Sequence, residues 1–276
     1  MDTSILEFLA APFVASLILT GIHAYLGVHV VERGVIFVDL SLAQIAALGA
    51  TIALLTPWSN GDPHSSYVYW ISLLFTFIGA LVFSTIRGHK ARIPQEAIIG
   101  ICYAVASAAA ILAMSKATSE SEHLKDMLVG NILAVSWPEV GKTAILYGTI
   151  GVFHYACRKQ FLAISMDPKA AEAQGISLRL WDFLFYASFG FVVTSSVAIA
   201  GVLLVFCYLI VPSVAAMLYA ESIGRRLAIG WTMGTVVSAL GVYLSLQLDL
   251  PTGATIVCTF GLVLILMAVV RPLFSR

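Results

Sequence analysis

Four polar side chains near the N-terminus are of types that bind a divalent metal ion: His23, His29, Asp39 and Gln44. They interrupt two long apolar runs, where ionisable groups are costly to bury and by default mark a transport pathway. An imidazole, a carboxylate and an amide oxygen together suit a divalent cation of borderline hardness. These residue types therefore indicate metal binding within a membrane. The alternative is that each side chain only hydrogen-bonds a neighbouring helix.

The depth of these residues follows from Arg33, which marks the turn between the two runs. His23 lies ten residues before Arg33 and Gln44 lies eleven after it, so both are roughly 15 Å from the turn at the rise of an α-helix. His29 and Asp39 are closer to the turn. An antiparallel hairpin would place His23 level with Gln44 and His29 near the level of Asp39. We expect His23 and Asp39 to be metal ligands, and all four side chains to contact the pathway.

Three other ionisable residues in or near apolar runs receive structural interpretations. Glu96 follows Pro94 in the first turn of a later run, where a carboxylate suits the positive end of the helix dipole. His154 and Asp182 lie near the ends of their runs, and we expect both to be solvated.

The elements that must position these side chains are membrane-spanning helices. Of the 276 residues, 60% are hydrophobic and 11% are charged, whereas a soluble domain has roughly 25% charged residues. Apolar runs of about twenty residues recur, the length that crosses a bilayer core. The sequence therefore predicts an all-α, polytopic transmembrane bundle that forms a single domain over residues 1–276.

We expect eight or nine spans, because the break between the sixth and seventh, at Ala200–Gly201, is weak. The stretch 126–137 is too short to cross and is expected to be a short helix or a re-entrant segment. The expected spans are residues 5–31, 35–56, 67–86, 94–114, 139–157, 181–199, 200–220, 228–247 and 252–270.

The distribution of Lys and Arg predicts the orientation of the chain. With the N-terminus outside, twelve of the fifteen basic residues fall on the cytoplasmic side, as the positive-inside rule requires. The C-terminus is then cytoplasmic. The formal net charge is zero, so the chain has no basic surface of the kind that binds nucleic acid.

The cytoplasmic segment 165–178 has the signals of a short capped helix. Asp167 can cap its N-terminus, Pro168 can occupy the first helical position, and Gly175 can end it. One interpretation is a solvated connector between two spans. The other is a rigid knob that docks a soluble partner.

The chain resembles the membrane subunits of bacterial ABC importers for divalent metal ions, the zinc and manganese uptake permeases. The resemblance covers nearly the whole chain. The segments that carry it are "MDPKAAEAQGI" (166–176), "AGVLLVFCYLIVPSVAAMLYA" (200–220), "LDLPTGATIV" (248–257), "EAIIGICYA" (96–104) and "DMLVGNILAVS" (126–136).

The resemblance implies a permease of the bacterial inner membrane that forms a homodimer and is surrounded by lipid. It implies cytoplasmic ATPase subunits that hold ATP and Mg, an extracytoplasmic metal-binding protein, and zinc or manganese as the substrate. This chain would then be no enzyme and would bind no cofactor itself. Asp167, Pro168, Ala171 and Gly175 would form the segment that couples to the ATPase.

The second span departs from the family's pattern of an Asp and a His four residues apart. Gln44 occupies the position of that His and Leu40 that of the Asp, while Asp39 is shifted by one residue, or about 100° around a helix. Two alternatives therefore remain open. One is an ABC permease for another small solute or a metal complex, and the other is a standalone secondary transporter.

Overall fold

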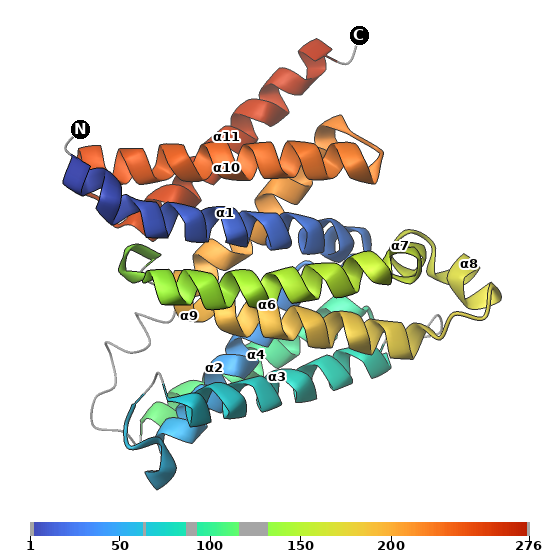
Figure 1. Ribbon diagram of the computed structural model, residues 1–276. Coiled ribbons are helices and arrows are strands. Elements are labelled where there is room, and N and C mark those ends of the chain that lie inside the picture. Colours follow the sequence, from blue (N-terminus) through green and yellow to red (C-terminus); the bar gives the residue numbers. More distant parts are fainter. Residues whose placement is uncertain (1–2, 63–64, 87–92, 116–131, 275–276) are drawn as a thin grey trace. The chain divides into compact units, whose positions relative to one another are not determined.

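The computed structural model describes residues 3–62, 65–86, 93–115 and 132–274 (Figure 1). Within these ranges the chain forms ten α-helices and two short 3-10 helices, and no β-strand. The prediction of an all-α protein is confirmed. Part of the predicted short segment 126–137 lies outside the described residues, and its last residues include the 3-10 helix η2.

The helices coincide with the predicted apolar runs, and a single helix, α9, carries the sixth and seventh of them. The α-helices are α1 Thr3–Glu32, α2 Val38–Leu54, α3 Ser66–Ile86, α4 Gln95–Met114, α6 Trp137–Ala156, α7 Arg158–Met166, α8 Pro168–Ala173, α9 Leu178–Tyr219, α10 Ile223–Leu248 and α11 Thr252–Phe274; the 3-10 helices are η1 Pro57–Ser59 and η2 Ile132–Ala134.

Six described helices are long and apolar enough to cross a membrane: α1, α3, α4, α9, α10 and α11. Helix α2 is apolar but has 17 residues. Helix α9 has 42 residues and is interrupted at Gly201, whose backbone (φ 75°, ψ 161°) is not helical. A positive φ is accessible to glycine without a steric penalty. The predicted break at Ala200–Gly201 is thus present in the structure.

The chain divides into two compact units, each built from segments distant in sequence. The first unit contains residues 1–31, 128–153 and 196–276, and the second contains residues 32–127 and 154–195. Helices α1, α6, α10, α11 and the end of α9 form most of the first unit. Helices α2, α3, α4, α7, α8 and the start of α9 form most of the second.

In the first unit, small residues let helices approach closely. A Cβ atom at Gly234 on α10 would overlap the side chain of Thr20 on α1, and one at Gly27 on α1 would overlap the carbonyl oxygen of Leu209 on α9. The indole N–H of Trp231 also donates to the Gly21 carbonyl oxygen at 3.0 Å. Close approach of this kind is how helices associate where no hydrophobic effect drives them together.

In the second unit, α2 packs against both α3 and α4. The Ser72 hydroxyl on α3 donates to the Ala46 carbonyl oxygen on α2 at 2.8 Å. A Cβ atom at Gly49 would lie 2.9 Å from the Phe75 side chain, so α2 and α3 are in close contact here. This packing fixes the helix that carries Asp39 and Gln44.

Candidate functional site

The structure places the four predicted pathway residues in two pairs. His23 and His29 lie on α1 in the first unit, whereas Asp39 and Gln44 lie on α2 in the second. All four are buried, with exposed fractions of 0%, 1%, 1% and 9% respectively. The expected pairing of His23 with Gln44 stays a prediction.

His23 is held in one tautomer by its own helix. Its Nδ1 atom lies 2.8 Å from the Leu19 carbonyl oxygen, and because a carbonyl oxygen only accepts, Nδ1 of the neutral ring carries the proton. The lone pair is then on Nε2, which has no hydrogen-bond partner among the described residues. The Tyr147 ring meets the imidazole edge-on at a centroid distance of 6.3 Å. A fixed imidazole with an unused nitrogen is the arrangement found in metal ligands.

Asp39 lies in the first turn of α2, because this helix begins at Val38, three residues later than the predicted span. Neither of its carboxylate oxygens has a hydrogen-bond partner among the described residues. The helix dipole favours a carboxylate at this end, but a buried carboxylate is stable only when it is paired, coordinated or protonated. Asp39 is therefore available to bind a cation.

Gln44 lies five residues after Asp39, about 140° away around an α-helix. The two side chains therefore do not share a face of α2. His29 lies in the last turn of α1, where a basic group suits the helix dipole. Its ring meets that of Tyr25 edge-on at 4.8 Å, so part of its environment is an aromatic packing contact.

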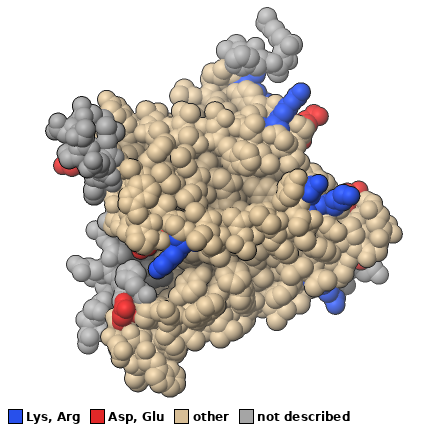
Figure 2. Space-filling model, viewed as in Figure 1, with Lys and Arg blue, Asp and Glu red and all other residues tan. Residues whose placement is uncertain are grey.

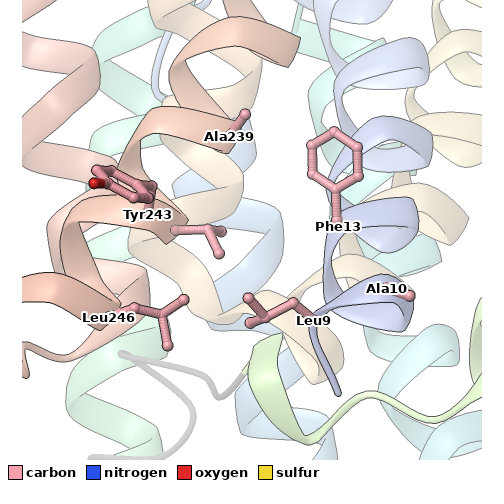
Figure 3. Close-up of a pocket in the computed structure, with 7 residues that line it drawn as sticks. Leu9, Ala10, Phe13, Ala239, Tyr243 and Leu246 are labelled. Atoms are coloured by element: carbon pink, nitrogen blue, oxygen red, sulfur yellow. The ribbon is translucent and has the colours of Figure 1, made fainter. Parts of the chain in front are cut away.

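Among the described residues, no three His, Cys, Asp or Glu side chains gather closely enough to hold a metal ion. A cavity of about 400 Å³ lies between α1 and α10 in the first unit (Figure 3). Its lining is almost wholly apolar and offers no carboxylate, imidazole or thiol ligand. The lining residues are Leu9, Ala10, Phe13, Ala239, Val242, Tyr243 and Leu246.

The predicted capped helix in the segment 165–178 is confirmed as α8. One carboxylate oxygen of Asp167 accepts the Ala170 N–H at 3.0 Å, and Pro168 is the first helical residue. Gly175 has a φ of 79°. The N–H groups of Gly175 and Ile176 donate to carbonyl oxygens at Glu172 and Ala171, at 2.9 and 3.1 Å. These two bonds form a Schellman motif.

The two caps make α8 a defined element although it has only six residues. It follows α7 as a separate short helix (Figure 1). The Ala171 side chain is buried, whereas Lys169 and Glu172 are exposed. Ala171 therefore anchors α8 to the second unit, and the polar residues face outward.

The prediction that Asp182 is solvated is wrong. Asp182 lies in the first turns of α9, and its carboxylate accepts a 2.7 Å hydrogen bond from Arg33, with both side chains fully buried. Arg33 also donates through Nε to the Ser165 hydroxyl at 2.9 Å, and its guanidinium lies 3.9 Å from the centre of the Phe185 ring. No spacing rule connects residues that are 149 positions apart, so this pair could not be predicted from the sequence.

His154 is also buried, not solvated, with an exposed fraction of 1%. Its Nε2 lies 2.8 Å from the Ser188 hydroxyl, and its ring stacks on Phe161 at 4.4 Å. Glu96, by contrast, has the structural role predicted for it. Its carboxylate accepts the backbone N–H of Phe37 at 2.9 Å, which ties the start of α4 to the turn before α2.

The face shown in Figure 2 carries few charged side chains. Large apolar side chains are exposed along several helices, as expected where helices contact lipid. Examples are Ile101, Val105, Leu112, Ile145, Val152, Leu262 and Val269. Long apolar helices with apolar outer faces define the class of this chain: it is an integral membrane protein.

The family follows from a sequence comparison. The model of the ABC 3 transport family matches residues 5–271, and this chain belongs to that family. The predicted resemblance is thereby confirmed.

The chain is similar to named relatives over most of its length. It is 28% identical, over 229 residues, to the manganese transport system membrane protein MntC of Listeria innocua, with 78% of this chain and 80% of that protein covered. It is 26% identical to the probable iron transport system membrane protein of Haemophilus influenzae, with 91% and 89% covered. Both relatives are named as membrane components of metal transport systems.

A solved structure shares the fold. The structure of PsaBC from Streptococcus pneumoniae in complex with Fab superposes with a TM-score of 0.78 at 22% identity, covering 94% of this chain and 90% of that one. At this identity the likeness shows a common fold.

Proposed function

We propose that this chain is the permease subunit of an ATP-driven importer that moves a divalent metal ion, manganese or zinc, across the bacterial inner membrane. The observation that carries the proposal is the family match over residues 5–271. The manganese named for the Listeria relative supports the choice of cargo. The chain acts as a transport subunit, and ATP with Mg is bound and hydrolysed on a partner.

We infer eight or nine membrane spans in one permease domain, with the N-terminus outside and the C-terminus in the cytoplasm. Support comes from the break in α9 at Gly201, which lets one long helix supply two spans. The predicted distribution of basic residues supports the orientation. A second copy of the chain completes the transport unit, and lipid surrounds it.

We infer that the metal passes His23, Asp39, Gln44 and His29, with His23 and Asp39 as ligands. The unused Nε2 of His23 and the unpartnered carboxylate of Asp39 support these two assignments. His23 offers an imidazole nitrogen, and Asp39 and Gln44 offer oxygen atoms. This set of ligand atoms suits divalent ions of borderline hardness better than soft ions.

Two soluble partners follow from the same proposal. Cytoplasmic ATPase subunits dock on α8 and its caps. The residues that shape this docking element are Asp167, Pro168, Ala171 and Gly175. An extracytoplasmic metal-binding protein delivers the ion on the opposite side. The double capping of α8 supports the first assignment, because a rigid helix transmits force better than a flexible loop.

Transport by purified complexes in proteoliposomes tests this function. We expect manganese or zinc uptake that requires the ATPase subunits and hydrolysable ATP, and none from this chain alone. Uptake by the chain without an ATPase would instead identify a secondary transporter. ATP-driven uptake of a metal chelate with no uptake of the free ion would identify a permease for metal complexes, the alternative that Gln44 in place of a histidine favours.

The pathway residues are tested with His23→Gln and Asp39→Asn. Each should reduce metal uptake about tenfold or more, the usual effect of removing a metal ligand or its support. The control is Thr51→Val on α2, because among the described residues the Thr51 hydroxyl bonds only within its own helix, to the Ala47 carbonyl oxygen. Uptake at the control's level in both variants would remove these residues from the pathway.

A further inference from the structure

A buried charged cluster in the second unit joins three segments that are far apart in the sequence. Its centre is the ion pair of Arg33 and Asp182, both with side chains fully excluded from solvent. Ser165 and Phe185 complete it, through a hydrogen bond to Arg33 Nε and an aromatic face against the guanidinium. The cluster lies outside the predicted metal pathway.

Arg33 forms hydrogen bonds to one residue before α8 in the sequence and to one residue after it. Ser165 belongs to α7, which ends one residue before the Asp167 cap. Asp182 belongs to α9, which begins shortly after the Schellman motif at Gly175. A displacement of α8 must move α7, α9 or both, and Arg33 is bonded to each of them.

Arg33 is also close in sequence to α2. It stands in the turn after α1, where Gly34 has a φ of 66°, and α2 begins at Val38. The Phe37 N–H at the end of this turn is held by Glu96. Asp39 follows in the first turn of α2. The turn is therefore fixed at one end by the charged cluster and at the other by α4.

We propose that Arg33 and Asp182 are positioning residues that transmit the movement of α8 to the N-terminal end of α2, and thereby to Asp39. This inference rests on the proposed function, because it takes α8 as the element displaced by the ATPase and α2 as part of the metal pathway. Every residue involved lies in the second unit. Neither residue touches the metal; both act through the placement of α2.

The chemistry of the cluster suits transmission. A buried ion pair is directional, and separating the two charges leaves each without solvent, so the pair resists sliding. The planar guanidinium is held in addition by Ser165 and by the Phe185 ring, which fixes its orientation as well as its distance. Apolar side chains of similar volume would fill the space but would allow the helices to slip.

The difference between filling space and transmitting movement supplies the test. Replacing a buried ion pair by apolar residues of similar volume often leaves stability unchanged. The double variant Arg33→Met with Asp182→Leu should therefore fold. The importer complex is reconstituted with its ATPase, and metal uptake and ATP hydrolysis are measured in the same proteoliposomes. We expect the ratio of uptake to hydrolysis to fall about fivefold or more, the lower end of coupling between linked sites.

Conservative and control variants complete the experiment. Arg33→Lys keeps the charge but loses the Nε bond to Ser165, and should lower the ratio less than the apolar double variant. Arg158→Gln is the matched control, because Arg158 contacts only Tyr155, one turn back, in the interactions seen here. It should leave the ratio unchanged. If the double variant fails to assemble, the ratio of uptake to hydrolysis in Arg33→Lys and Asp182→Glu tests the proposal instead.

Each outcome bears on one proposal. A double variant, or both conservative variants, with the wild-type ratio of uptake to hydrolysis would overturn the transmission role. A reduced ratio in a complex of wild-type thermal stability supports it. The absence of ATP-dependent metal uptake by the wild-type complex would instead overturn the proposed function, and so the two failures are distinguishable.

Discussion

Both units pack their helices closely at glycines, and the second unit adds a buried ion pair. In the first, glycines at positions 27, 234 and 241 let helices touch, and hydroxyl groups bond between them. In the second, a buried ion pair, an arginine on an aromatic face and two helix caps organise the end of the unit that carries α7 and α8. Van der Waals contact is non-directional, whereas ion pairs and caps fix orientation.

The buried ion pair determines which parts of the molecule tolerate movement. Helices packed through small residues can shift slightly while they keep most of their contact area. Helices joined by a buried ion pair cannot shift in this way. A small separation weakens the attraction between the two charges, and neither charge gains contact with water in return. The region around Arg33 should therefore move as one body, and substitutions there should have larger effects than substitutions in the first unit.

The largest effect is expected from Asp182→Ala. Removing one partner of a buried ion pair leaves the other charge uncompensated and destabilises by about 3–5 kcal/mol. Unfolding of the purified protein in detergent measures the loss. Arg158→Ala, which removes an arginine outside the cluster, should change stability by less than about 1 kcal/mol. An effect of Asp182→Ala as small as that control would refute the contrast between the units.

The next largest effect is expected from Gly27→Ala in the first unit. The new methyl group would meet the backbone of Leu209, which cannot rotate away, and overpacking of this kind destabilises by about 1–3 kcal/mol. Gly21→Ala on the same helix is the control, since nothing lies within 4 Å of its added methyl group. That variant should be neutral or more stable, because alanine favours helix formation. Similar unfolding of both variants would show that α1 is not closely packed at Gly27.

The sequence predicted those features that depend on local chemistry. The caps of α8 follow from Asp167, Pro168 and Gly175, residues whose roles are set within one or two turns. The break at Gly201 and the apolar helices were predicted for the same reason. The place of Glu96 in the first turn of α4 was also predicted, whereas its partner, the Phe37 N–H 59 residues away, was not.

The features that depend on distant segments were not predicted. Asp182 and His154 were expected in water because each stands near the end of an apolar run. Their burial requires Arg33, Ser188 and Phe161, which the fold brings from other helices. The arrangement of His23 with respect to Asp39 is of the same kind, and it stays a prediction.

A smaller and local effect is expected from Asp167→Ala, which removes the N-cap of α8. Loss of such a cap destabilises a helix by about 1 kcal/mol. Because α8 has six residues, the effect should appear as faster amide hydrogen exchange within α8 and not as global unfolding. Asp167→Asn retains a cap acceptor and should keep the protection of the wild type. Equal exchange in all three proteins would mean that the Asp167 carboxylate does not stabilise α8.

The smallest effect is expected from Tyr208→Phe in the first unit. The Tyr208 hydroxyl is buried and bonded to Ser238 at 3.0 Å, but Ser238 also donates to the Gly234 carbonyl oxygen on its own helix. Removal of the hydroxyl group therefore leaves Ser238 satisfied, and we expect a loss of about 0.5 kcal/mol in the free energy of unfolding in detergent, near the average for such bonds between membrane helices. Arg33 and Asp182 instead form a fully buried ion pair, so substitution of either one removes the counterion of a buried charge. If Tyr208→Phe destabilised the protein as much as Asp182→Ala, hydroxyl contacts would fix the first unit as firmly as charges fix the second.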